Sequence, residues 1–254
     1  MIRAKSPISI TLFCVALSLE VVLNAGLAKP LGAQTATDNI LISKNVFADV
    51  NFDPPGDGKP SDTAGGASRG NGCSSEEISA GGCFTPLMPA SMKGLTTSER
   101  PTFLVYIPEN SGTKQVFFRL VDENNQNVYQ DKISVTANQG VMAIKLPNNV
   151  ALEVGKNYQW TFIAIGEQGL RPDSLGIQGT IKRIELTANL KNQLATASAL
   201  EQAGLYSENK IWFDTASTLA ELRKTRPDDK TLENNWKDLL SSVGLGAIAT
   251  KPLL

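Results

Sequence analysis

The chain has 254 residues, of which 41% are hydrophobic and 19% charged, and its formal net charge is −1. This composition is typical of a globular protein and argues against a disordered or fibrous chain, and without a basic excess general nucleic-acid binding is not expected. Because the chain contains no histidine, Ser-His-Asp and Cys-His nucleophile activation and histidine-ligated metal sites are excluded. Its length allows one large domain or two small ones.

Residues 1–33 have the features of an export signal. Arg3 and Lys5 form a short positive start, residues 8–19 (ISITLFCVALSL) are apolar, and small residues follow. These are the parts of a secretory signal peptide, for which we expect cleavage after Ala33 or, as the second choice, after Ala28. The sequence therefore predicts a protein exported to the periplasm or the extracellular space.

An uncleaved membrane anchor is the alternative for this segment. A spanning helix needs about 20 apolar residues, and Glu20 interrupts the apolar run after residue 19. We therefore favour cleavage, and we expect no membrane span once the signal is removed.

Residues 34–83 are expected to form an extended N-terminal segment. Residues 53–82 contain eight glycines and three prolines, a composition typical of a linker or surface loop. After signal cleavage Cys73 and Cys83 are the two cysteines that remain. In an oxidising compartment they are expected to form a disulfide, whereas a redox pair or metal site usually has closer cysteine spacing.

Residues 84–186 have the pattern of an antiparallel β-sandwich. Short runs rich in β-branched and aromatic residues are separated by turn signals, which is typical of sandwiches and barrels. The runs are residues 102–107, 116–121, 128–135, 141–146, 158–165 and 177–184. In the fifth run aromatic and polar residues alternate, which places Tyr158 and its aromatic neighbours on the core face.

Tyr158 resembles the tyrosine corner of immunoglobulin-like and fibronectin-type sandwiches. Leu152, Gly155 and Tyr158 have the order seen there, where the phenol bonds to backbone upstream. The alternative is a plain core tyrosine. The Cys…Trp…Cys set of true immunoglobulin domains is absent, so the expected fold is α+β with an immunoglobulin-like sandwich in the wider sense.

Residues 187–254 are expected to form a helical hairpin or three-helix cap. One helix is predicted over residues 187–203, a second with Ser207 as its cap, and a third capped by Asp228 or Asp229. In the third, apolar residues from Leu232 to Val243 lie on one face. Val243-Gly244-Leu245 fits a glycine C-cap followed by an apolar contact.

The motifs that carry chemistry are incomplete. Asp49, Asn51 and Asp53 begin like a calcium loop, but Pro54 and Pro60 stand where that loop needs its glycine and glutamate. The glycine-rich residues 65–70 lack the Gly-Lys-Ser/Thr that cradles phosphate. We therefore expect no cofactor, no metal and no catalytic residues, although two carboxylates that meet only in space would leave no local pattern in a sequence.

Several segments together carry a family resemblance. The most specific are residues 65–70 (GGASRG) and 98–103 (SERPTF). The others are residues 52–56, 94–97, 106–108, 211–214, 219–222 and 236–240. Together they resemble the domain of unknown function 928 family of exported, mainly cyanobacterial proteins. The resemblance implies export and a β-rich body with a helical tail, and it implies no activity and no catalytic residues.

We therefore expect an exported, non-enzymatic interaction or structural protein of the cell envelope with a protein partner. The alternatives are a glycan-binding module that uses the sandwich loops and, less favoured, a carboxylate-based hydrolase. Arg69 is expected either to dock on Glu99 or to meet an acidic group of a partner. The candidate structural or interaction residues are Arg69, Glu99, Arg100, Tyr158, Trp212 and Trp236.

Overall fold

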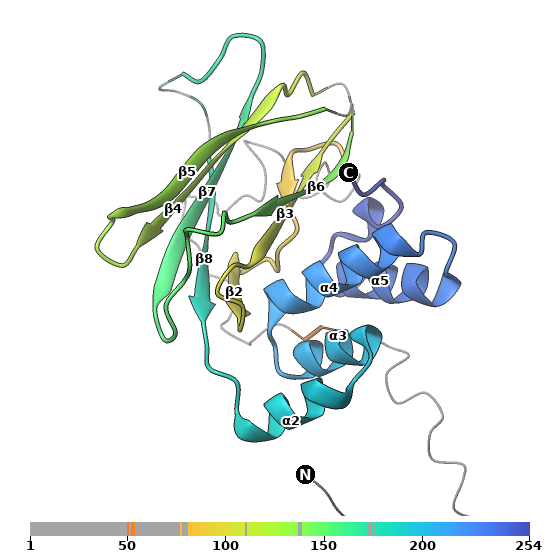
Figure 1. Cartoon of the computed structure of the whole chain (residues 1–254). Helices are drawn as coiled ribbons and strands as arrows, with labels where there is room; N and C mark the ends of the chain where they lie inside the picture. The colour runs from red at the N-terminus through yellow and green to blue at the C-terminus, as the bar shows by residue number, and fades with distance from the viewer. Residues whose placement is uncertain are drawn as a thin grey trace, which may run out of the picture. The chain divides into compact units, whose positions relative to one another are not determined.

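The computed structural model describes residues 50, 52–53, 77, 81–109, 111–136, 139–171, 174 and 176–254. Asn45–Leu254 form one compact unit, which contains two mostly antiparallel sheets followed by helices (Figure 1). The predicted α+β class is therefore confirmed. The strands are β1 (Thr85–Pro86), β2 (Lys93–Thr96), β3 (Thr102–Ile107), β4 (Gln115–Asp122), β5 (Asn127–Ser134), β6 (Gly140–Lys145), β7 (Asn157–Ile165) and β8 (Ile177–Arg183).

The strands divide into a large and a small sheet. The large sheet has the order β2-β8-β7-β4-β5 and the small sheet has the order β1-β3-β6. All pairings of these strands are antiparallel except that of β2 with β8, which is parallel. The six predicted runs correspond to β3–β8, whereas β1 and β2 were not predicted because they are short and show no alternation.

The two sheets face each other across an aromatic core. Phe103 on β3 lies 4.8 Å from Phe118 on β4, measured between ring centroids, and 6.3 Å from Phe162 on β7. These rings are no more than 1% exposed. On β4 and β7 buried residues alternate with more exposed ones, so the inward position of Phe118 and Phe162 follows from the period of two in a strand. β3 is buried along nearly its whole length and shows no such alternation.

The region after β8 contains more helices than the sequence predicted. The helices are α2 (Ala188–Thr196), α3 (Ala199–Glu208), α4 (Trp212–Thr225), α5 (Lys230–Ser242) and the 3-10 turn η1 (Gly246–Ile248). The single helix predicted over residues 187–203 is wrong, because Ser198 and Glu201 form a capping box that begins a new helix. Ser207 is likewise not a cap but part of α3.

The end of the helical region agrees with its sequence signals. Asp229 caps α5 by accepting from the amides of Thr231 and Leu232. After α5 the Leu245 amide donates to the Leu240 carbonyl at 2.7 Å, and Gly244 has φ +76°. This is the predicted glycine C-cap. No helix in the described part of the chain is long and apolar enough to cross a membrane.

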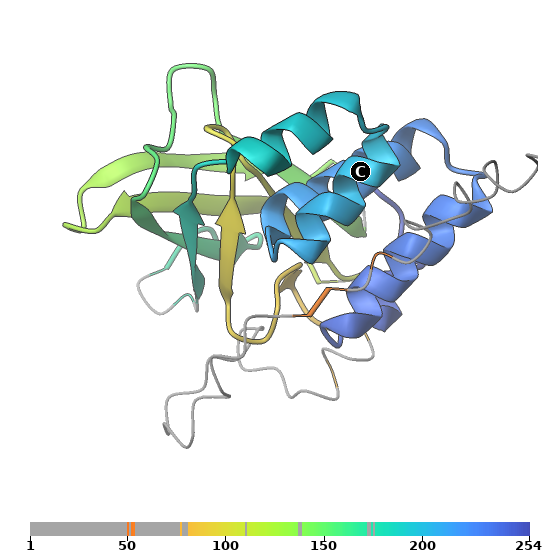
Figure 2. The ribbon, with the colours of Figure 1, turned by 90° about the horizontal axis from the view of Figure 1, so that it is seen from below.

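Helix α4 joins the sheets to the rest of the helices. It packs against β2 and β3 on one side and against α3 and α5 on the other. Figure 2 shows β2, the edge strand of the large sheet, next to the helices. Part of the segment predicted to be extended also enters this core, because Phe52 is buried and its ring meets that of Trp212 edge-on at 4.8 Å.

Candidate functional site

The site begins where β2 and α4 cross, and two of the segments that carried the family resemblance meet there. Gly94 on β2 lies directly under Phe213 on α4, and a Cβ atom at position 94 would come within 2.6 Å of the ring. Only glycine allows this approach without displacing the ring. The glycine of residues 94–97 and the phenylalanine of residues 211–214 therefore act together to seat the helix on the strand.

Asp214 fixes the same joint one residue further along α4. The hydroxyl of Thr96 donates to Asp214 Oδ2 at 2.6 Å, and the hydroxyl of Thr97 donates to Oδ1 at 2.6 Å. The Thr97 amide also donates to Oδ2 at 3.2 Å. Both carboxylate oxygens are thus occupied by donors from the end of β2.

The surroundings of the Asp214 carboxyl also change its pKa. Its side chain lies in the first turn of α4, where the helix dipole stabilises a negative charge, and the residue is 8% exposed. Burial raises the pKa of this carboxyl, while the hydrogen bonds from Thr96 and Thr97 oppose the rise. Nearby, burial and the charge of Asp214 raise the pKa of the half-buried Tyr206 phenol.

A polar cavity of about 370 Å³ opens beside this joint. Hydroxyl groups predominate among its walls, and the guanidinium of Arg100 and the ring of Tyr206 lie at its edge. The lining residues are Thr96, Thr97, Ser98, Arg100, Pro101, Thr102, Tyr206, Phe213, Asp214, Ser217 and Thr218. A ligand here would meet many hydroxyl groups, the Asp214 carboxyl and one cation.

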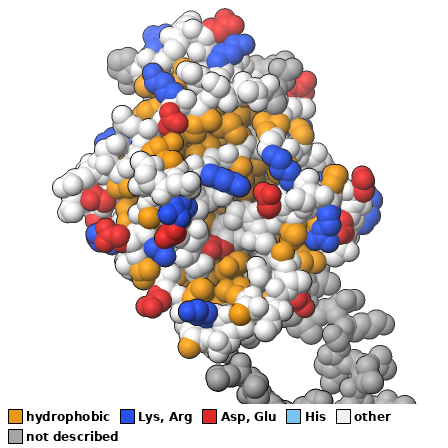
Figure 3. All heavy atoms as spheres, viewed as in Figure 1, with side chains coloured by type: hydrophobic (Ala, Val, Ile, Leu, Met, Phe, Trp, Pro, Cys, Tyr) orange, Lys and Arg blue, Asp and Glu red, His pale blue; other side chains and the backbone are white. Residues whose placement is uncertain are grey.

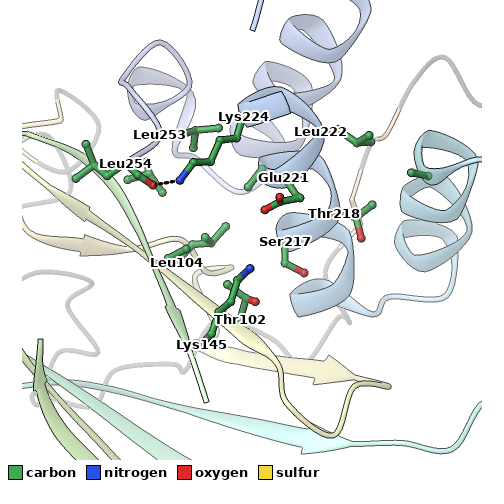
Figure 4. Close-up of a pocket in the computed structure, with 14 residues that line it drawn as sticks. Thr102, Leu104, Lys145, Ser217, Thr218, Glu221, Leu222, Lys224, Leu253 and Leu254 are labelled. Atoms are coloured by element: carbon green, nitrogen blue, oxygen red, sulfur yellow. Dashed lines mark hydrogen bonds between the residues drawn. The ribbon is translucent and has the colours of Figure 1, made fainter. Parts of the chain in front are cut away.

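A second cavity, of about 490 Å³, continues from the first along α4. The two cavities share Thr102, Ser217 and Thr218 in their walls, so they are adjacent, and we term them together the α4 groove. Leu104, Val141 and Ala220 are buried on the floor of this second part. Figure 4 shows Lys145 reaching from the sheet toward α4, with Ser217 and Glu221 on the opposite side.

The charges around this second part have mixed sign. Lys145, Glu221 and Lys224 line it and are exposed, and the Lys224 amine donates to the Leu254 carbonyl at 2.8 Å. The groove rim therefore carries charges of both signs. On the face shown in Figure 3, basic and acidic side chains are interspersed and hydrophobic side chains gather between them.

Two of the predicted interaction residues, Glu99 and Arg100, are adjacent and paired. The Arg100 guanidinium donates to the Glu99 carboxylate and, through Nε, to the Asn148 carbonyl at 3.3 Å. Arg100 also lines the polar cavity. Arg69, the predicted mate of Glu99, lies outside the described residues, so that pairing stays a prediction.

The predicted disulfide stays a prediction as well. Cys83 is 4% exposed and packs in the main core. Cys73 lies outside the part of the chain that the structure describes.

The three remaining candidate residues are core residues. Tyr158, Trp212 and Trp236 are at most 4% exposed. The amide of Glu153 donates to the Tyr158 hydroxyl at 2.9 Å, which is the upstream backbone bond that the corner resemblance predicted. The Trp212 indole donates to the Leu87 carbonyl at 2.9 Å, and the Arg223 guanidinium lies 5.9 Å from the centre of the Trp236 ring.

Metal centres and sugar platforms are the other kinds of site that a chain of this type could carry. The described residues contain no cluster of three or more His, Cys, Asp or Glu side chains suited to a metal ion. Their exposed large hydrophobic residues are Val154 and Leu170, neither of which is aromatic, while Phe117, Tyr129 and Tyr206 are half-buried. Among the described residues, the α4 groove combines an apolar floor with polar walls over two adjacent cavities.

Sequence reasoning missed Asp214 and the two threonines as a unit. Asp214 lies 118 positions after Thr96, and no local periodicity connects them. The signal that was present is the resemblance itself, since residues 94–97 and 211–214 were both among the segments that carried it.

Comparisons with known proteins agree with that resemblance. The family model described as Domain of Unknown Function (DUF928) matches residues 64–253, a range that includes both sheets, α2–α5 and nearly the whole α4 groove. A comparison with curated proteins found no match. Because the match covers far more than half of the sequence, the chain belongs to the DUF928 family.

Proposed function

We propose that this protein is an exported, non-enzymatic binding protein of the cell envelope that holds a protein partner in the α4 groove. The observation that carries the proposal is the groove itself. It is long and open, with a buried apolar floor formed by Leu104, Val141 and Ala220 and a polar end beside Asp214. Apolar surface flanked by hydrogen-bonding groups suits recognition of a polypeptide.

Export is part of the same proposal. Support comes from the N-terminal sequence, where a positive start, an apolar run and small residues follow one another. A disulfide between Cys73 and Cys83 would fit an oxidising compartment. Periplasmic or extracellular location would make another envelope or secreted protein the natural partner.

The finer description of the fold is also a proposal. We propose that the two sheets form an immunoglobulin-like sandwich in the wider sense, with the helices as a cap on one side. The facing aromatic rings and the backbone bond to the Tyr158 hydroxyl support this. The parallel pairing of β2 with β8 is a departure from the all-antiparallel pattern.

A carboxylate-based hydrolase is the second candidate function. It is favoured by two acids of unlike environment along one helix, because Asp214 is buried with a raised pKa and Glu221 is exposed, and both line the groove. Binding is preferred because the hydroxyls of Thr96 and Thr97 already occupy both oxygens of Asp214. A general acid or base needs an oxygen that can reach the substrate.

The proposal is tested by filling the groove at its centre. Thr218 lines both cavities and is half-buried, so Thr218→Trp should block a bound polypeptide while leaving the core in place. Lys237→Trp on the exposed side of α5 is the matched control. Photo-crosslinking within the host envelope identifies the partner of the wild type and compares its capture by the two variants. The partner is then purified in its free form, and its affinity for each variant is measured by calorimetry.

We expect Thr218→Trp to abolish binding of that partner and Lys237→Trp to leave its affinity unchanged. Equal affinity of both variants would exclude the groove as the binding site. Hydrolysis of a partner or glycan by the wild type, lost in Glu221→Gln, would favour the second candidate instead.

A further inference from the structure

The small sheet ends in an open strand edge that borders the groove. β6 is the last strand in the order β1-β3-β6, so its outer side has no neighbouring strand of the sheet. At one end of that side the last residues of the chain pair with it in parallel. The Val141 amide donates to the Pro252 carbonyl at 2.8 Å, and the Leu254 amide donates to the Val141 carbonyl at 2.9 Å.

Beyond Val141, this edge continues without a partner. In a strand, backbone groups point alternately to the two sides, so Ala143 and Lys145 point outward as Val141 does. The partners across the sheet agree, because the carbonyl of Leu104, which lies opposite Ala143, faces β1 and accepts from the Leu87 amide. Among the described residues, none bonds to the backbone of Ala143 or Lys145 on this outer side.

The chain's own tail turns away at the point where the open edge begins. A continued parallel strand would offer the Leu254 carbonyl to the Ala143 amide, but that carbonyl instead accepts from the Lys224 amine on α4 (Figure 4). The side chain of Leu254 packs closely on Gly140, where a Cβ atom would come within 2.7 Å of Leu254 Cδ2. Residues 252–254 therefore pair with Val141, and no described residue pairs with Ala143 or Lys145 on this side.

We infer that the partner binds as an extended segment whose backbone pairs in parallel with Ala143 and Lys145 on the outer edge of β6. This inference rests on the proposed function, because it specifies how a polypeptide would occupy the α4 groove. Strand addition obtains its affinity from main-chain hydrogen bonds and its specificity from pockets for alternate side chains.

The groove also determines the side chains that such a segment would carry. Alternate residues of the added strand would point over the floor formed by Leu104 and Ala220, where an apolar side chain fits. Lys145 is exposed and reaches into the groove (Figure 4), which favours an acidic residue nearby. The expected partner segment is therefore extended, with alternating apolar and acidic residues.

The position of Lys145 on the edge strand also has the opposite explanation, that it prevents strand pairing, and the experiment must distinguish the two. Lysine on an edge strand is one way in which proteins prevent unwanted strand pairing. If Lys145 serves only that purpose, an added strand would find no stable place at Ala143 and Lys145.

The probe is the blocked pentapeptide acetyl-Thr-Val-Glu-Val-Thr-amide, together with two N-methylated versions. One version is methylated at its first, third and fifth residues, and the other at its second and fourth. Because alternate amides of a strand point to opposite sides, only one version loses the donors that face β6. Binding to the full chain is followed by the NMR shifts of the Ala143 and Lys145 amides, with Ala143→Pro as a variant that lacks one edge donor.

The unmodified peptide should shift both amides and slow their hydrogen exchange, and it should bind Ala143→Pro more weakly than the wild type. One methylated version should bind roughly tenfold more weakly, as expected for the loss of two or three backbone hydrogen bonds, and the other should bind like the parent. Equal binding by both versions, or no shift of these amides by the parent peptide, would overturn the inference.

Failure of this inference can be told apart from failure of the proposed function. If Thr218→Trp abolishes binding of the native partner but the two methylated peptides behave alike, the groove binds its partner without strand pairing. If the peptides differ but Thr218→Trp leaves the native partner bound, the edge accepts strands and the proposed function is wrong.

Discussion

The two faces of β3 serve different purposes. On the face toward the large sheet, Phe103, Val105 and Ile107 are at most 1% exposed and take part in a continuous aromatic and aliphatic core. On the face toward α4, Thr102 is half-buried and, with Leu104, lines an open groove. One strand thus supplies the core on one side and lines the proposed binding groove on the other, so substitutions on the two faces should be separable in their effects.

The largest expected effect is on the closed face. Phe103→Ala removes a ring that contacts four other aromatic rings, and filling that space requires movement of both sheets. We expect a loss of about 3–5 kcal/mol in the free energy of unfolding, measured by urea denaturation. Thr102→Ala, one residue earlier on the open face, should change it by no more than about 0.5 kcal/mol.

A comparable loss in the free energy of unfolding of both variants would show that the open face also contributes to the stability of the fold. The comparison is most informative when partner binding is measured on the same samples, because Thr102 lies in the groove and Phe103 does not.

The next largest loss of stability is expected where β2 and α4 cross, beside the polar end of the groove. Gly94→Ala introduces a methyl group within 2.6 Å of the Phe213 ring, and such overpacking costs about 1–3 kcal/mol. A smaller side chain at position 213 should relieve the clash, so Gly94→Ala should cost less in a Phe213→Leu background. The free energies of unfolding in this double-mutant cycle are measured by thermal or urea denaturation. If the losses from the two substitutions are additive, the contact between positions 94 and 213 is not the source of the strain.

The closed face could be predicted from the sequence, and the open face could not. Alternation such as Tyr158, Trp160 and Phe162 is local, and each of these residues is buried as the period of two predicts. By contrast, β2 is only four residues long and pairs in parallel with β8, far along the chain. A short strand with a glycine and a distant partner leaves no local periodicity to detect.

The helical region shows the same limit at shorter range. The apolar spacing of residues 187–203 predicts one continuous helix, but Ser198 and Glu201 stop and restart it. That capping box was present in the sequence as Ser followed three residues later by Glu, so the break could have been found. The bonds from Thr96 and Thr97 to Asp214 depend on how the strand and the helix meet in space, and no local pattern encodes them.

Asp214 gives the joint a pH dependence of definite sign. Because burial raises the pKa of its carboxyl, the folded protein holds a proton that the unfolded chain has already released at pH values just above the ordinary pKa. The stability contributed by this group is therefore complete below the ordinary pKa and is lost as pH rises through the raised value. Asp214→Asn should lack this loss.

The measurement is the difference between wild type and Asp214→Asn in urea midpoints, taken from acid to neutral pH. Exposed carboxylates with lowered pKa values, such as Glu123 and Glu201, act with the opposite sign in both proteins and cancel in the difference. A wild type that gains stability relative to Asp214→Asn as pH rises would mean that the threonine hydrogen bonds outweigh burial.

The smallest effect is expected at Tyr158, which connects the closed core to the polar end of the groove. Its hydroxyl accepts from the Glu153 amide, and the neighbouring Leu152 amide donates to the Glu99 carbonyl at 2.8 Å. Glu99 in turn pairs with Arg100 on the cavity wall. Tyr158→Phe removes one hydrogen bond to a partly buried amide, so we expect a loss of about 1 kcal/mol.

The more specific consequence of Tyr158→Phe is local. With the Glu153 amide released, the Leu152 amide should exchange its hydrogen faster, while amides of the central strand β4 keep their protection. Tyr129→Phe is the matched control, since that hydroxyl bonds to the exposed Asp131 carboxylate at 3.2 Å, and it should change neither stability nor exchange. If Tyr158→Phe is equally silent in both measurements, Tyr158 stabilises the protein through its buried ring alone, and the groove keeps its polar end without the hydroxyl.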